Sequence, residues 1–242
     1  MSRTDAQALD AGEKRALDLF GSGDPMKRVP WNCLDFTGEC DRARGGRSFS
    51  ALAQDDADPT FVIFCGSLEP AALDPPAAFA LQRTIESWHA PDLSEYDALV
   101  LDVKQSDGLT YTLVLKDTPL ERRVDGRLAS TVSWEHDFHC PGQSGSGRVV
   151  LHFKDFKPFY RGKEMESATP LNWSNIQSLS IMCRSFFGKQ EGGFALQLFS
   201  ITAYRYRPPG ASVSTPPQND GKQSVKRRSQ VFRGLRRLMG KK

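Results

Sequence analysis

Residues 106–116 read SDGLTYTLVLK, and this stretch decides the fold class. Tyr111, Leu113 and Leu115 recur at every second position, which is the period of a β-strand with one face on a core. The Ser-Asp-Gly at 106–108 supplies the glycine that a tight turn needs. The stretch therefore predicts a β-hairpin that joins residues 98–104 to residues 110–116.

Short apolar runs separated by Gly, Pro, Asp and Ser clusters continue on both sides, from about Phe49 to Tyr206. No segment between them could supply the crossover helices that parallel strands require. We therefore predict an all-β fold, a jelly-roll-like antiparallel β-sandwich with disordered or helical tails, although a barrel is also compatible with this pattern. The predicted strands are residues 49–53, 61–68, 77–85, 98–104, 110–116, 130–138, 149–153, 178–184 and 194–206.

Polar segments are predicted at both ends of this domain. Residues 1–30 form a polar leader, with a short helix over Ala11 to Phe20 as one option, and residues 31–206 form the domain. Residues 207–222 are rich in Pro, Gly and Ser and predict a linker. Residues 223–242 form a basic amphipathic tail, whose apolar stripe is Val231, Phe232, Leu235, Leu238 and Met239.

The tail allows two interpretations. It is either a disordered charged segment, or a helix that forms when an anionic membrane surface or an acidic partner neutralises its arginines. The candidate contacts for the second interpretation are Arg233, Arg236, Arg237, Phe232 and Leu235.

The charge of the sequence is concentrated in this tail. The formal net charge is +3, and residues 221–242 hold nine Lys or Arg and no acidic residue, so residues 1–220 carry −6. A mildly acidic body is a poor nucleic-acid binder, because duplex affinity rests on Lys and Arg that neutralise phosphates. The five cysteines are scattered and odd in number, which indicates a reducing compartment. No apolar run of about 20 residues and no secretory signal is present, which predicts a soluble or peripheral protein.

The segment Asp41–Ser48, DRARGGRS, could cradle a phosphate, touch RNA or bend the chain. A phosphate loop leads into a helix and carries Gly-Lys-Ser or Gly-Lys-Thr, whereas here a strand-like run follows. We predict a bend that only glycine tolerates, which directs Ser48 into the sandwich. Arg42, Arg44 and Arg47 around it are candidate partner contacts.

No catalytic or metal constellation can be assembled from the sequence. His136, His139 and Cys140 carry the right ligand types for zinc, but no second cluster completes a tetrahedral set. No pair of acids can be singled out and no nucleophile elbow is present. We expect no catalytic residue, no metal and no cofactor.

The four tryptophans offer a different kind of site, a platform on which a sugar stacks. We expect Trp134 to be buried, because it lies in an alternating run. Trp88 and Trp173 lie in loop-like segments and are the candidates for exposure and for partner contact.

Several motifs appear in order along the domain: GGRS at 45–48, FCGSL at 64–68, VVLHFKDFKPFYRG at 149–162, LNWSNIQSLSIM at 171–182 and GGFALQLFSITAY at 192–204. Their order and spacing over residues 31–206 resemble the CIA30 family, named for the complex I intermediate-associated protein. This resemblance implies a β-sandwich similar to galactose-binding-like domains. It also implies a non-enzymatic assembly factor that binds unassembled subunits or assembly intermediates of mitochondrial respiratory complex I.

Some alternatives remain beside this resemblance. The leader has as many acidic as basic residues, unlike an import signal, so the cytoplasm is the alternative to the mitochondrion. A module that binds carbohydrate or another small ligand is the alternative function. An enzyme is the third hypothesis, and the missing catalytic groups disfavour it.

Overall fold

The computed structural model describes residues 15–126, 128–140 and 146–206. Strands dominate these residues, and the helices among them are short 3₁₀ turns, η1 (Cys33–Asp35), η2 (Asp41–Arg44), η3 (Pro70–Ala72) and η4 (Phe153–Asp155). In the described part of the chain, no helix is long and apolar enough to cross a membrane. The linker and tail predicted for residues 207–242 lie outside the described residues.

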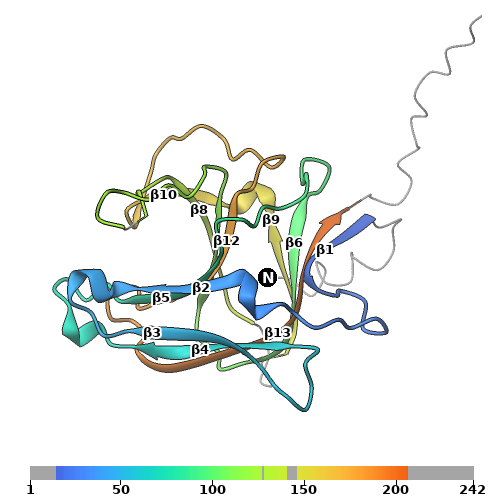
Figure 1. Ribbon diagram of the computed structural model, residues 1–242, viewed down its shortest axis with the longest axis horizontal. Helices are drawn as coiled ribbons and strands as arrows, with labels where there is room; N and C mark the ends of the chain where they lie inside the picture. The colour runs from blue at the N-terminus through green and yellow to red at the C-terminus, as the bar shows by residue number, and fades with distance from the viewer. Residues whose placement is uncertain (1–14, 127, 141–145, 207–242) are drawn as a thin grey trace, which may run out of the picture. The chain divides into compact units, whose positions relative to one another are not determined.

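Two antiparallel sheets make up the domain, which confirms the predicted sandwich (Figure 1). The first sheet has the order β3 (Phe49–Gln54), β4 (Val62–Leu68), β13 (Gly192–Arg205), β6 (Ala98–Ser106), β9 (Gly147–His152), and β1 (Arg15–Gly21) also pairs with β13. The second sheet has the order β11 (Lys163–Glu164), β10 (Lys157–Tyr160), β8 (Ser133–Phe138), β7 (Tyr111–Lys116), β12 (Ser178–Arg184), β5 (Phe79–Thr84), β2 (Phe36–Cys40).

The core lies between the two sheets and is built from alternate residues of each strand. Tyr111, Leu113 and Leu115 of β7 are fully buried, as their spacing predicts, and the Tyr111 ring contacts Phe64 of the first sheet edge-on at 6.1 Å. Burying each leucine of this kind stabilises the fold by roughly 2 kcal/mol relative to leaving it exposed. The apolar residues at alternate positions in the sequence are therefore the ones on the inner face of each sheet.

The hairpin predicted between residues 98–104 and 110–116 is wrong. β6 pairs with β13 and β9 in the first sheet, whereas β7 pairs with β12 and β8 in the second. The Ser-Asp-Gly turn carries the chain from one sheet to the other, and Asp107 fixes it by accepting hydrogen bonds from Leu109 N (2.9 Å), Tyr111 Oη (2.9 Å) and Ala195 N (2.7 Å). A period of two reports which face a strand buries and not which strand it pairs with, so the two arrangements look alike in sequence.

The helix considered for residues 11–20 is also wrong where the structure describes it, because Arg15–Gly21 is a strand. β1 runs antiparallel to the second half of β13, with a bulge between Asp18 and Phe20. Phe20 is buried between two tryptophan rings, at 5.2 Å from Trp31 and 5.4 Å from Trp88. Part of the predicted leader therefore belongs to the sandwich.

Candidate functional site

The arginine-rich segment Asp41–Ser48 forms one 3₁₀ turn followed by a bend at two glycines. η2 ends at Arg44 and is followed by Gly45, which has a left-handed φ of 84° and donates its N–H to Arg42 O at 3.0 Å. At Gly46, a Cβ would lie 2.1 Å from Asp41 Oδ1, so only glycine lets the chain pass this side chain. The predicted bend is confirmed. Gly45 is required by its left-handed φ, and Gly46 is required by its close approach to Asp41.

Asp41 is the centre of this bend and is only 1% exposed. Its carboxylate accepts hydrogen bonds from Ser48 N (3.1 Å), Ser48 Oγ (2.6 Å) and Phe79 N (3.3 Å). Ser48 Oγ in turn accepts the N–H of Glu69 at 3.1 Å. The carboxylate thus connects the start of β3 to the start of β5 and to the end of β4.

The three arginines of this segment are exposed, on the surface that the bend creates. Arg44 is held in place, because it donates to Ala77 O and its guanidinium lies over the Phe79 ring at 5.5 Å. Arg42 and Arg47 are exposed beside it. The structure therefore brings the three candidate contacts onto one segment.

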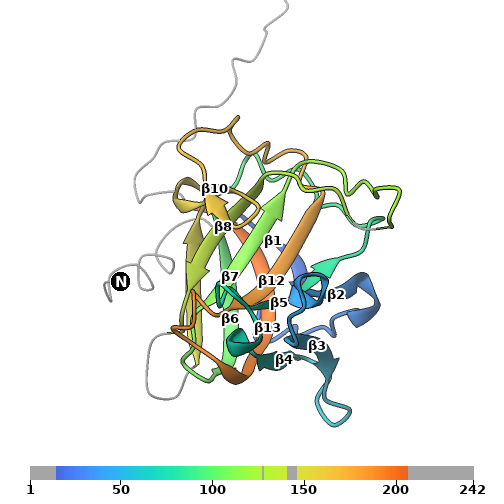
Figure 2. The ribbon, with the colours of Figure 1, turned by 90° about the vertical axis from the view of Figure 1, so that its left-hand side faces the viewer.

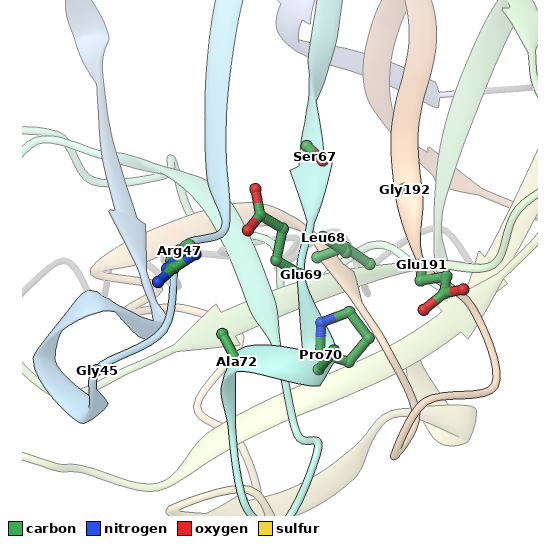
Figure 3. Close-up of a pocket in the computed structure, with 10 residues that line it drawn as sticks. Gly45, Arg47, Ser67, Leu68, Glu69, Pro70, Ala72, Glu191 and Gly192 are labelled. Carbon is green, nitrogen blue, oxygen red and sulfur yellow. The ribbon is translucent and has the colours of Figure 1, made fainter.

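A hollow of about 570 Å³ adjoins Arg47. Figure 3 shows Arg47 and Glu191 at opposite sides of the labelled residues, with Glu69 and Pro70 between them. The hollow thus presents both signs of charge around a small apolar floor. Its lining is Gly45, Arg47, Ser67, Leu68, Glu69, Pro70, Ala71, Ala72, Glu191 and Gly192.

A second hollow, of about 490 Å³, continues along the outer side of the first sheet. Two of its lining residues, Gly66 and Gly193, are chain neighbours of residues that line the first hollow, Ser67 and Gly192. It is mainly apolar, and its largest exposed side chain is Phe49, which is 49% exposed. Its lining is Phe49, Ala51, Cys65, Gly66, Asp107, Gly193, Phe194 and Ala195.

Both hollows lie beside β3, which is the edge strand of the first sheet. Along β3 the side chains of Phe49, Ala51 and Ala53 are exposed, while those between them are half-buried. We call the exposed residues of β3, the two hollows and the three arginines together the edge surface. It combines an apolar face with exposed cations, of which Arg47 lines the first hollow, and this suits it to binding a polypeptide.

The tryptophans do not form an exposed platform. Trp88 stacks on Phe20, and Trp173 stacks on Phe153 with centroids 3.5 Å apart and an interplanar angle of 2°. Both are half-buried and pack against the core, so the expected exposure is wrong. Loop segments close over the ends of a sandwich, and their aromatic residues then extend its core. Trp134, expected to be buried, is half-buried and packs against the core.

The fold places the three residues of the His-Cys segment in different surroundings. Cys140 is buried in the core, the ring of His136 packs edge-on against Phe156 at 5.3 Å, and His139 is exposed. In residues 15–126, 128–140 and 146–206, no group of three His, Cys, Asp or Glu is arranged to hold a metal.

The candidate contacts of the tail cannot be placed. Arg233, Arg236, Arg237, Phe232 and Leu235 lie outside the described residues.

The sequence interpretation missed a charged network on the outer face of the second sheet. Arg83, Lys116, Glu135 and Arg184 occupy outward positions of four strands, yet Arg83 is 5% and Glu135 8% exposed. Burial raises the pKa of Glu135 against the opposing effect of Arg184, and burial lowers the pKa of Lys116. The only signal in the sequence was a charge at an alternate position of each strand, which normally indicates contact with solvent.

A comparison with known families decides where the chain belongs. The family model described as Complex I intermediate-associated protein 30 (CIA30) matches residues 27–198. The chain belongs to the CIA30 family. The CIA30 match includes the bend at Asp41–Ser48, both hollows and the outer face of the second sheet.

A relative of this chain is found in fission yeast. The uncharacterized protein C9E9.15 of Schizosaccharomyces pombe is 38% identical to this chain over 176 residues, which are 72% of this chain and 79% of the yeast protein.

Solved structures with a similar outline come from bacterial carbohydrate-binding modules. The family 11 module of the cellulosomal cellulase Lic26A-Cel5E of Clostridium thermocellum has a TM-score of 0.45 at 13% identity and covers 80% of this chain and 95% of its own. The family 11 module in complex with a β-1,3-1,4-mixed-linked tetrasaccharide has the same TM-score and identity, over 78% of this chain and 94% of its own. A likeness at this level says nothing about what a CIA30 chain binds.

Proposed function

We propose that this protein is a non-enzymatic assembly factor that binds unassembled subunits of mitochondrial respiratory complex I. The observation that carries the proposal is the CIA30 match, whose description names a complex I intermediate and which spans residues 27–198. The partners are subunits or assembly intermediates of that complex, and the working compartment is the mitochondrion.

The edge surface is where we place the partner. An apolar segment of an unassembled subunit buries Phe49 and the alanines of β3, which are exposed in the free protein. Arg47 of the first hollow can pair with an acidic residue of that segment, and Glu69 and Glu191 can pair with a basic one. An assembly factor must release its client, and a surface with one large apolar side chain gives the modest affinity that release requires.

The charges along the edge surface support binding and not chemistry. Its hollows are lined by Arg47, Glu69, Glu191 and Asp107, which come from separate loops and strand ends. Asp107 already accepts three hydrogen bonds, so it is a structural group.

The basic tail provides a second contact in this proposal. Phe232 and Leu235 bury in an anionic membrane surface while Arg233, Arg236 and Arg237 meet lipid headgroups. Such a contact holds the sandwich close to the membrane where subunits are joined.

Affinity capture after crosslinking in fractionated cells tests this function. A tagged chain should recover complex I subunits from the mitochondrial fraction, and a Phe49→Glu/Ala51→Lys variant should recover several-fold less. Lys163→Glu is the matched control, because Lys163 is exposed on β11, the edge strand of the other sheet. A chain ending at residue 222 should recover the same subunits with less membrane. Recovery of other proteins alone, from the cytoplasm, would reject the proposal.

A further inference from the structure

The outer face of the second sheet is polar but withdrawn from solvent. In β7 and β12 one set of side chains packs in the core, so Thr112, Val114 and Lys116 and, across from them, Ser178, Ser180 and Met182 point outward. Figure 2 shows β8, β7, β12 and β5 side by side, and β7 and β12 are the two middle strands of this group. Thr112 is 0%, Ser178 2% and Ser180 6% exposed. We call these outward residues, with the charged groups around them, the polar face.

Two arginines lie at the sides of the polar face. Arg184 starts on β12 and crosses β7 to reach β8, where Nη1 lies 2.7 Å from Glu135 Oε2 and Nη2 lies 2.6 Å from Asp137 Oδ1. Arg83, on β5, pairs with Glu39 of β2 and with Glu86 at 3.3 Å. Arg184 therefore lies across β7 toward β8, whereas Arg83 is directed toward the edge strand β2.

The pairing satisfies each carboxylate of the polar face. Glu39 and Glu86 accept from Arg83, and Glu135 and Asp137 accept from Arg184. Glu135 also accepts Ser133 Oγ at 2.9 Å, and Asp137 accepts Thr112 Oγ1 at 2.6 Å. Each carboxylate of this face therefore already has a hydrogen-bond donor as its partner.

Donors remain on this face, among them the Lys116 ammonium and the hydroxyls of two serines on the neighbouring strand. Among the described residues, none of the ion pairs within 4.0 Å and none of the side-chain hydrogen bonds includes the Lys116 ammonium. Ser178 lies directly opposite Lys116 in the β7–β12 register, and Ser180 is the next residue on the same face. No side-chain hydrogen bond to another described residue uses either hydroxyl, and Arg184 Nε is buried without a partner in the described part of the chain.

The Lys116 ammonium lies in a partly buried environment with no close acceptor among the described side chains. Burial lowers the pKa of Lys116, and the carboxylates of Glu39 and Glu135 offset this only from a distance. A half-buried ammonium without a hydrogen-bond acceptor is costly to keep charged. A bound group with acceptor oxygens would remove that cost.

We propose that the polar face binds a carboxylate group, which accepts hydrogen bonds from the Lys116 ammonium and from the hydroxyls of Ser178 and Ser180. A carboxylate is favoured over a phosphate because Glu39 and Glu135 flank the lysine and would repel a second negative charge. The carboxylate comes either from a small metabolite or from the C-terminus of a polypeptide. This site lies on the opposite sheet from the edge surface, so it does not depend on the proposed function.

The test is a titration of the ¹⁵N-labelled full chain, followed by amide chemical shifts. Acetate and N-acetyl-glycylglycine are the carboxylate probes, and acetamide, the dipeptide amide and inorganic phosphate are the comparison probes. We expect a saturable shift of the Lys116, Ser178 and Ser180 amides with a carboxylate probe and none with the amides. Tighter binding of acetate indicates a small metabolite, whereas tighter binding of the dipeptide indicates a polypeptide terminus.

Variants separate binding from folding. Lys116→Met keeps the length and the apolar stem of the side chain and should weaken carboxylate binding at least tenfold. Lys157→Met is the matched control, because Lys157 is an exposed lysine that pairs with Glu164 at 3.0 Å, and it should bind as the wild type does. Ser178→Ala should weaken binding several-fold with an otherwise unchanged spectrum. No saturable shift with either carboxylate, stronger binding of phosphate, or equal binding by Lys116→Met would overturn the proposal.

Discussion

Asp41 shows at the scale of one residue how this fold uses a buried charge. Its carboxylate accepts three hydrogen bonds from Ser48 and Phe79, and it is only 1% exposed. In an Asp41→Ala variant those donors lose their acceptor, so we expect the free energy of unfolding to fall by about 3 kcal/mol. Urea unfolding measures this change. Asp56→Ala, at an exposed position, should change it by less than about 0.5 kcal/mol, and equal effects of the two variants would contradict the role of Asp41.

Glu135 gives the fold a defined pH dependence. Burial raises its pKa above the ordinary value of 4.5, so between 4.5 and the raised pKa the folded chain keeps a proton that the unfolded chain has lost. The stability that this proton contributes is fully present at lower pH and is lost as the pH rises through the folded pKa.

The comparison with Glu135→Gln isolates this contribution, because glutamine does not titrate. The unfolding free energy of the wild type minus that of the variant should fall with rising pH, by up to about 1.4 kcal/mol per pH unit inside the window. Urea unfolding between pH 4 and pH 8 measures the difference. A difference that is constant or rises with pH would show that Arg184, and not burial, determines the direction in which the pKa of Glu135 is shifted.

Single residues differ in how far the sequence predicts them. The glycines at 45 and 46 were predictable, because a bend is a local property of the backbone and few residues allow it. The polar face was not predictable, because its ion pairs join strands that are distant in sequence, as when Arg184 of β12 pairs with Glu135 and Asp137 of β8. The Trp88 and Trp173 stacks depend in the same way on residues brought together by the fold.

At the scale of elements, β1 tests whether the N-terminal segment belongs to the domain. Phe20 of β1 is buried and stacks between Trp31 and Trp88. Phe20→Ala should lower the free energy of unfolding by about 3–5 kcal/mol, since it leaves a cavity in the core. Phe49→Ala is the matched control on exposed β3 and should change stability by less than about 0.5 kcal/mol. Equal, small effects of the two variants would indicate that residues 15–21 are a leader outside the folded domain.

The strands themselves were largely predictable, but their partners were not. Alternation found the nine strands of residues 49–206 that have the longest apolar runs. It missed β2, which carries Gly38 between polar residues, and β10, which contains Pro158, because both interrupt the pattern at a sheet edge or near one. It paired β6 with β7, although the turn between them changes sheets. Pairing is set by contacts over long sequence distances, which a local pattern does not contain.

The whole molecule combines a sandwich of the CIA30 family, within an acidic stretch, with a basic C-terminal segment. The family match supplies the assembly role that we propose, and the fold supplies a surface for it, the exposed side of β3 with its arginines. The order of motifs along residues 31–206 made this relationship predictable from the sequence. The edge surface itself was predictable only at its arginines, because the exposure of Phe49 follows from the position of β3 at the edge of its sheet.

Native gel electrophoresis of complex I, in cells that lack this protein and in the same cells with it restored, tests the central claim most directly. Cells without the protein should accumulate partly assembled complex I and lose the full complex. The wild type and the Lys163→Glu control should restore the full complex, whereas Phe49→Glu/Ala51→Lys should not. Normal amounts of full complex I in cells without the protein would contradict the account.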